Sequence, residues 1–137
     1  MLPLTESLLT EEPKKLVNEL FNKGKMKKDV SASQMRRFYD DFLLLQKKAN
    51  GLNEEEFNKQ ILPLIRFSKA KMAYNVGREV LPIEFMQGIE PYINMVACKN
   101  DFDTFLLFYQ ALIGYTKFEE FEQKNRRYQP QKNYGGR

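Results

Sequence analysis

Apolar residues recur at intervals of three and four positions along most of the chain, which is the spacing that places side chains on one face of an α-helix. The clearest example lies within residues 31–50, where the apolar face consists of Met35, Phe38, Tyr39, Phe42, Leu45 and Ala49. No segment combines alternating apolar and polar residues with hairpin turns, as paired strands would. The pattern therefore predicts an all-α protein.

Start and stop signals divide this pattern into about five helices, which we expect to form a bundle. The first is predicted from residue 11 to residue 23, because Thr10 precedes two glutamates and a proline and because Gly24 follows. The second is predicted from Ser31 or Ser33 to about residue 50, and the third begins after Asn53, which precedes three glutamates. The fourth begins near Pro82, and the last covers about residues 102–124. Two prolines should bend their helices: Pro63 should kink or split the third, and Pro91 should kink the fourth.

The chain has 137 residues, which is the length of one domain, and we expect that domain to span residues 1–124. Residues 125–137 contain no acidic residue and little that could fill a core, which predicts a flexible basic tail. The tail combines cations with aromatic rings: Arg126, Arg127, Tyr128, Lys132, Tyr134 and Arg137. This combination is suited to binding RNA, but it is equally compatible with a tail that only keeps the protein soluble.

The last predicted helix is apolar on nearly every side. One side carries Phe102, Phe105, Leu106, Tyr109, Leu112 and Ile113, and the other carries Leu107, Ala111, Tyr115 and Phe118. A short domain has difficulty burying both sides. Two interpretations stay open: the helix self-associates or docks on a partner, or it is a central helix wrapped by the other four.

Composition narrows the possible chemistry. The chain has no histidine and one cysteine, Cys98, and its net charge is +4. Without histidine the chain lacks the commonest general base and transition-metal ligand, and a single cysteine forms neither an intrachain disulfide nor a thiolate zinc site. We therefore expect no catalytic residues, no metal and no cofactor. No stretch approaches the length of a membrane span, so we expect a cytoplasmic protein with no membrane partner.

Two helices carry candidate binding residues. On the third, Lys59, Arg66 and Lys69 lie broadly opposite the apolar face, and a flank carries Lys71, Tyr74 and Arg78, with Phe67 nearby. Cations of this kind suit the phosphates of single-stranded nucleic acid, and a ring offers a stacking surface. The alternative is a solvated face.

On the second helix, Arg36 and Arg37 stand one turn before Asp40 and Asp41, so they pair with these carboxylates, or Arg36 reaches a phosphate or a neighbouring subunit. Leu44 projects from the polar face, which hints at a protein contact.

Three stretches share their order and spacing with a known family. Residues 33–39 read SQMRRFY, residues 62–78 run from LPLIR to KMAYNVGR, and residues 108–118 read FYQALIGYTKF. They resemble a family signature S-Q-(apolar)-R-(basic)-F-aromatic, a basic helix ending in A-Y-x-x-G-R, and a final apolar helix. The chain thus resembles, over about residues 31–121, the small subunit of type III-A CRISPR effector complexes, the Csm small subunit family.

This resemblance implies a five-helix, non-catalytic protein that stacks in several copies and lines the channel where target RNA pairs with guide RNA. It implies contact with the RNA backbone through the matching basic residues Arg36, Arg66, Lys69, Lys71 and Arg78, to which the charged face adds Lys59. Arg78 has a second possible role in bracing the fold. The implied partners are target single-stranded RNA or the guide-target duplex, other copies of the chain, and the large and backbone subunits. The alternative function is a helical protein-protein adaptor.

Overall fold

A computed structural model describes the backbone of residues 1–22 and 31–135 and the side chains of residues 1–21 and 32–125. The described residues form helices and loops without a strand, which confirms the all-α prediction. The helical segments are α1 (Glu6–Leu9), α2 (Glu11–Asn22), α3 (Ser31–Ala49), α4 (Glu54–Gln60), α5 (Leu62–Gly77), α6 (Ile83–Met95) and α7 (Lys99–Gly135). Single residues separate α1 from α2 and α4 from α5, so counting each pair as one gives the five helices predicted.

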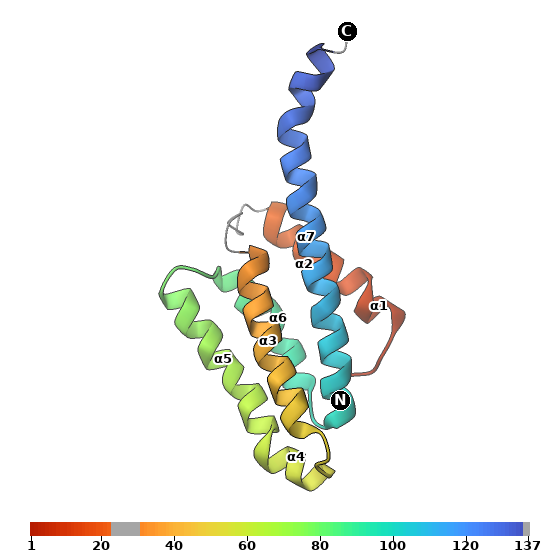
Figure 1. Ribbon diagram of the computed structural model, residues 1–137, viewed down its shortest axis with the longest axis vertical. Helices are drawn as coiled ribbons and strands as arrows, with labels where there is room; N and C mark the ends of the chain where they lie inside the picture. Colours follow the sequence, from red (N-terminus) through yellow and green to blue (C-terminus); the bar gives the residue numbers. More distant parts are fainter. Residues whose placement is uncertain (23–30, 136–137) are drawn as a thin grey trace.

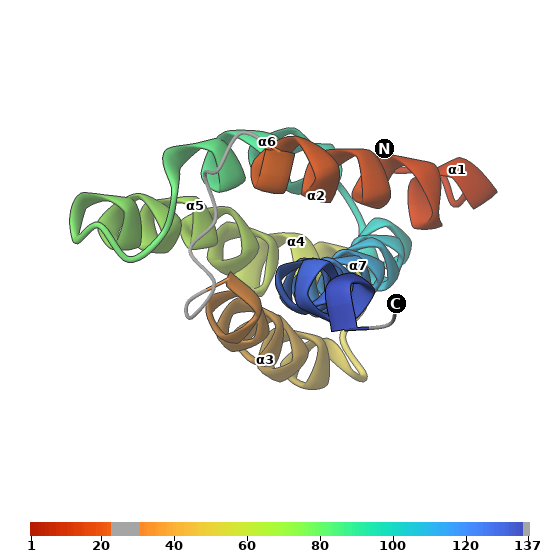
Figure 2. The same cartoon turned by 90° about the horizontal axis from the view of Figure 1, so that it is seen from above.

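The bundle is arranged around the lower half of α7 (Figure 1). Seen from above, α1, α2 and α6 lie on one side, α3 lies on the other, and α4, α5 and α7 lie between them (Figure 2). Helix α7 packs against both α2 and α3, whereas α5 packs mainly against α6 and more lightly against α3. The upper part of α7 extends beyond the other helices (Figure 1).

The core is built from aromatic side chains of α7. The Phe42 ring of α3 meets the rings of Phe105 and Tyr109 edge to face, at centroid distances of 5.1 and 5.6 Å. On the opposite side, the Tyr92 ring of α6 stacks on Phe108 at 4.1 Å. Such pairs add to the burial of large apolar areas. The apolar last helix was interpreted either as a self-associating helix or as a central helix wrapped by the others. The second interpretation therefore describes its first half.

Local signals set several helix ends as predicted. Asn53 and Glu56 form a capping box at the start of α4, in which each side chain accepts from the backbone N–H of the other residue. The third predicted helix splits at Ile61, so that Pro63 lies in the first turn of α5, where its missing N–H costs no hydrogen bond. Gly51 takes a left-handed φ of 87° after α3, a conformation that glycine adopts without strain.

The last helix is longer than predicted. It begins at Lys99 and its backbone is helical to Gly135, whereas the sequence predicted a helix over about residues 102–124; the flexibility of residues 125–137 stays a prediction. Once the packed half of the helix has formed, each further residue adds a hydrogen bond without a new nucleation cost. The side chains from residue 126 onward, and the whole of residues 23–30, lie outside the described residues.

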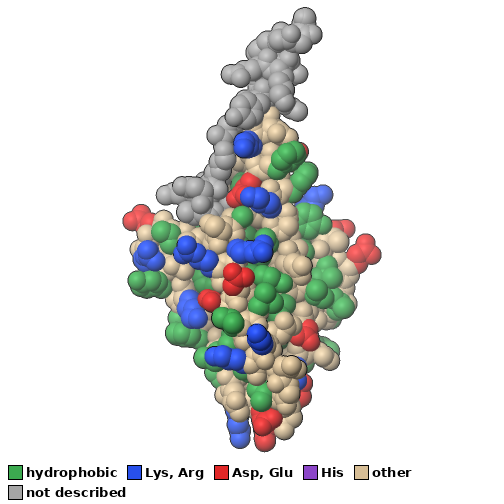
Figure 3. Space-filling view, viewed as in Figure 1, with side chains coloured by type: hydrophobic (Ala, Val, Ile, Leu, Met, Phe, Trp, Pro, Cys, Tyr) green, Lys and Arg blue, Asp and Glu red, His purple; other side chains and the backbone are tan. Residues whose placement is uncertain are grey.

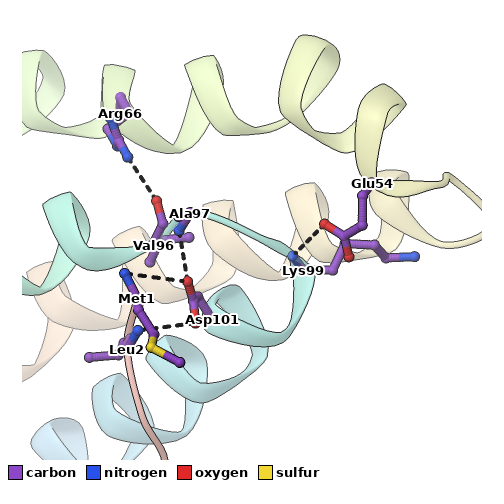
Figure 4. A network of polar contacts seen from close by, with 8 residues as sticks. All are labelled: Met1, Leu2, Glu54, Arg66, Val96, Ala97, Lys99 and Asp101. Atoms are coloured by element: carbon purple, nitrogen blue, oxygen red, sulfur yellow. Dashed lines mark hydrogen bonds and ion pairs between the residues drawn. The ribbon is translucent and has the colours of Figure 1, made fainter.

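Asp101, in the first turn of α7, ties the N-terminal segment to the bundle (Figure 4). Its buried carboxylate accepts hydrogen bonds from the N–H groups of Leu2 and Ala97, both at 3.0 Å. Burial alone would raise the pKa of Asp101, but these two bonds, a hydrogen bond with Cys98 and the N-terminal ammonium of Met1 lower it below its usual value. The folded state therefore favours the ionised form.

Replacing Asp101 with asparagine should lower the free energy of unfolding by about 1–2 kcal/mol at neutral pH, because a carboxylate acceptor is removed. A lowered pKa contributes stability above the unfolded-state value, and this contribution is lost as the pH falls through the native value. The difference between wild type and Asp101→Asn should therefore shrink in acid. Urea unfolding at neutral and acid pH measures it, with the exposed Asp40→Asn as the control. Equal stability of wild type and Asp101→Asn at neutral pH would contradict the proposed anchor.

Candidate nucleic-acid interface

Helix α5 is covered on two sides, and this divides its predicted cations into two groups. Arg66 and Lys69 lie toward α6, where both are partly buried. Lys71 and Arg78 are exposed and lie beside exposed aromatic rings. The predicted placement of Arg66 and Lys69 on one open face therefore differs from the structure, because α6 packs along that side of α5.

Arg66 joins α5 to the end of α6. Its Nη2 donates to the backbone oxygen of Val96 at 2.8 Å (Figure 4). Val96 caps the C-terminus of α6, directly after Met95, so its carbonyl has no partner within the helix. The Arg66 Nε is buried, and no hydrogen-bond partner for it lies within the described part of the chain. Lys69 makes a parallel contact, in which its Nζ donates to Asn94 Oδ1 at 2.7 Å. These contacts favour a bracing role for Arg66.

The other flank of α5 pairs each exposed ring with a cation one turn later. Lys71 Nζ lies 5.5 Å from the centroid of the Phe67 ring. Arg78 Cζ lies 5.6 Å from the centroid of the Tyr74 ring. Both distances are within the range of a cation–π interaction, so each ring holds its cation near the helix surface.

Phe67, Lys71 and Tyr74 line a groove between α3 and α5. It consists of two adjoining hollows of about 250 and 580 Å³, which share Phe38, Asp41, Phe67 and Lys71. The α3–α5 groove, as we call it, is lined further by Gln34, Arg37, Phe42, Leu44, Leu45, Lys48, Leu64, Ser68, Ala70, Tyr74 and Asn75. On the face drawn in Figure 3, Lys and Arg side chains lie among apolar side chains over the region of α3 and α5.

The charge of the α3–α5 groove is mainly positive. Arg37 and Lys48 come from α3 and Lys71 from α5, and Asp41 is the single carboxylate among the lining residues. The salt bridges among the described side chains do not pair Arg37 with Asp41, although the spacing of these residues allows it. The groove therefore presents cations from two helices to a ligand.

Arg36 and Lys59, two of the predicted cations, lie outside this groove. Arg36 is exposed near the start of α3, and Lys59 is exposed in the last turn of α4. Leu44 is 59% exposed, as predicted, but it lies on the wall of the groove. Lys48 was not predicted, and Arg37 was considered only as a partner of the neighbouring aspartates. A helical wheel represents one helix and does not show which neighbouring helix each of its faces contacts. The sequence therefore did not reveal that α3 and α5 supply cations to the same groove.

Among the described residues there is neither a cluster of metal ligands nor a helix that could span a membrane. Among residues 1–21 and 32–125, no three Cys, Asp or Glu side chains converge as a metal site would require. No helix in the described residues combines the length and the hydropathy needed to cross a membrane.

Replacing Arg66 with alanine should lower the free energy of unfolding by about 1–2 kcal/mol, because the Val96 carbonyl loses a charged donor. Replacing the exposed Arg78 with alanine should change it by less than about 0.5 kcal/mol. Chemical denaturation of both variants checks the contrast. Equal stability of the two would show that Arg66 does not brace the fold.

Comparison with known protein families places these features in context. The model of one family, described as Csm2 Type III-A, matches residues 10–122. This range covers most of the chain, from the start of α2 to well inside α7, and includes both walls of the α3–α5 groove. No curated protein sequence and no solved structure matches the chain. The chain belongs to the Csm2 Type III-A family and is a small subunit of a type III-A CRISPR complex.

Proposed function

We propose that the chain is a cytoplasmic, non-catalytic RNA-binding subunit that stacks in several copies within the complex and contacts the backbone of the target RNA. Its partners are then target single-stranded RNA or the guide-target duplex, other copies of the chain, and the large and backbone subunits. Family membership supports its place in the complex. The surface that contacts RNA is argued from the charges of the α3–α5 groove.

One observation carries this proposal: two helices supply cations to the same groove. Arg37 and Lys48 line it from α3, Lys71 lines it from α5, and Arg78 lies beside its lining residue Tyr74. Cations spread along a groove contact successive phosphates and release the counterions of the strand. Such contacts position RNA without reading its sequence, so base pairing with the guide is left to supply the specificity.

The groove also supports a role without catalysis. Acid-base chemistry requires groups at hydrogen-bond distance from one another and from a substrate atom. Asp41 is the single carboxylate lining the groove, and the other charged side chains there are cations. The arrangement suits binding, and we assign no reaction to it.

Reversing two charges with Lys71→Glu and Arg78→Glu should weaken binding of single-stranded RNA on the order of ten-fold at low salt. The slope of log affinity against log salt should become shallower by about 0.7 for each phosphate that the variant no longer neutralises. The matched control is Lys14→Glu with Lys15→Glu, which makes the same charge change at exposed positions of α2. Fluorescence anisotropy over a salt series measures both. Equally weakened binding in the two variants would point to net charge alone.

The proposed stacking of copies has a separate candidate surface on α7. Phe118 and Phe121 are 57% and 56% exposed, their ring centroids are 6.3 Å apart, and Leu107 lies exposed further down the helix. Exposed apolar side chains on one helix are typical of a protein contact. This observation favours the adaptor as the second candidate function, and a subunit of a stacked assembly can combine both functions.

Replacing Phe118 and Phe121 together with serine should weaken self-association by about ten-fold or more, because two partly exposed rings can no longer be buried between copies. Sedimentation velocity over a range of protein concentrations measures the change. The affinity of the variant for RNA should stay close to that of wild type. A wild type that sediments as a monomer at every concentration, or an unchanged variant, would exclude this face as the contact.

A further inference from the structure

We propose that the α3–α5 groove binds an unpaired stretch of RNA by stacking bases on Phe67 and Tyr74, so that this surface prefers single-stranded RNA to duplex RNA. The inference rests on the proposed RNA-binding function. It goes beyond that function in two ways: it names the form of RNA that the groove recognises, and it assigns two side chains to contact with bases rather than with phosphates.

Helix α5 carries a repeated unit of a ring and a cation. Phe67 is followed four residues later by Lys71, and Tyr74 is followed four residues later by Arg78. The spacing of four, three and four residues places all four side chains on one side of the helix. Each unit supplies one flat ring for a base and one cation for a phosphate, which are the two components of single-strand binding surfaces.

Both rings of this repeat are exposed to solvent. Phe67 is 53% exposed and Tyr74 is 66% exposed, although the same chain buries most of its other large aromatic side chains that the structure describes. Contact between a ring and a base requires an open ring, and stacking does not depend on which base is present. The exposed rings therefore add affinity without adding sequence specificity, as a guide-directed complex requires.

The two rings lie apart along the helix. Tyr74 is seven positions after Phe67, which corresponds to a rise of about 10.5 Å. A strand that runs along α5 must span at least this distance to bring one base to each ring, which requires a few nucleotides, within the range of known single-strand binding modules.

The shape of the groove leaves room for a base beside Phe67. Phe67 and Lys71 border both hollows, so space lies on either side of this ring. The smaller hollow has apolar walls from Leu44 and Leu64, and Lys48 lines it from α3. A base beside Phe67 would thus meet an apolar wall, while its phosphate lies within reach of cations from both helices.

A duplex cannot use the rings in this way. In an RNA helix, the faces of the bases are covered by their neighbours, and the major groove is too narrow for side chains to enter. A duplex would therefore contact only the cations of the groove, whereas an unpaired strand gains the cations and the rings. The difference predicts a preference for the single strand.

The alternative occupant is a protein, because exposed rings also occur at protein contacts. The cations favour RNA: each ring carries its own cation, and cations from the facing helix line the same groove. An apolar protein contact would have to cover several of these charges without compensation, which is costly.

The test compares the full-length chain with Phe67→Leu combined with Tyr74→Leu, which keeps apolar side chains but removes both rings. The probes are a single-stranded RNA of about ten nucleotides, the same strand in a duplex, and an abasic strand of the same length. The ring variant should bind the single strand at least about ten-fold more weakly than wild type. Its affinity for the duplex and the abasic strand should be unchanged, and its salt slope should equal that of wild type.

The matched control is Phe67→Tyr combined with Tyr74→Phe, which exchanges the two residues and keeps both rings, so it should bind the single strand as wild type does. Unchanged single-strand binding by the leucine variant would overturn the stacking inference but not the proposed RNA-binding function. If that variant also failed to join other subunits, the occupant of the groove would be a protein. Failure of wild type to bind any of the three probes would overturn the proposed function together with the inference.

Discussion

The packing of α7 between α2 and α3 is the constraint on which the rest of the structure depends. Phe105, Phe108 and Tyr109 are buried on that helix, so its two sides must both be covered by other elements. Burial of rings of this size supplies much of the stabilisation available to a short domain. Polar contacts then hold its neighbours in place: Asp101 ties down the N-terminal segment, and Glu120 of α7 accepts from the N–H of Ala32 in the first turn of α3 at 3.3 Å. A carboxylate at that position also suits the helix dipole.

The groove follows from this arrangement. Because α3 packs mainly on α7 and α5 packs mainly on α6, the two helices meet only along an edge. Arg66 strengthens the contact between α5 and α6 by donating a hydrogen bond to the Val96 carbonyl. The flank of α5 that is turned away from α6 is then free to expose Phe67, Tyr74 and the cations beside them. The candidate site is therefore a consequence of how the core distributes its contacts.

The features that depend on neighbouring residues could be predicted from the sequence. The cap at Asn53, the split before Pro63 and the apolar period of each helix are encoded within a few positions. What depends on tertiary packing was missed or misplaced. The direction of Arg66 is set by α6, thirty residues away along the chain, and the contribution of Lys48 to the groove exists only once α3 meets α5. The extension of α7 to residue 135 was missed because composition favoured a coil, whereas a packed helix propagates cheaply.

The two groups of cations on α5 show why charge alone is a poor guide to a binding surface. Arg66 and Lys71 are five residues apart and carry the same charge, but one donates to a backbone carbonyl of its own fold and the other lies over an exposed ring. A cation already engaged in the fold must give up that bond before it can serve a ligand, whereas one held on a ring stays at the surface with its hydrogen-bond donors open to solvent. Placement relative to neighbouring helices, more than the number of positive residues, therefore decides which side of α5 can bind RNA.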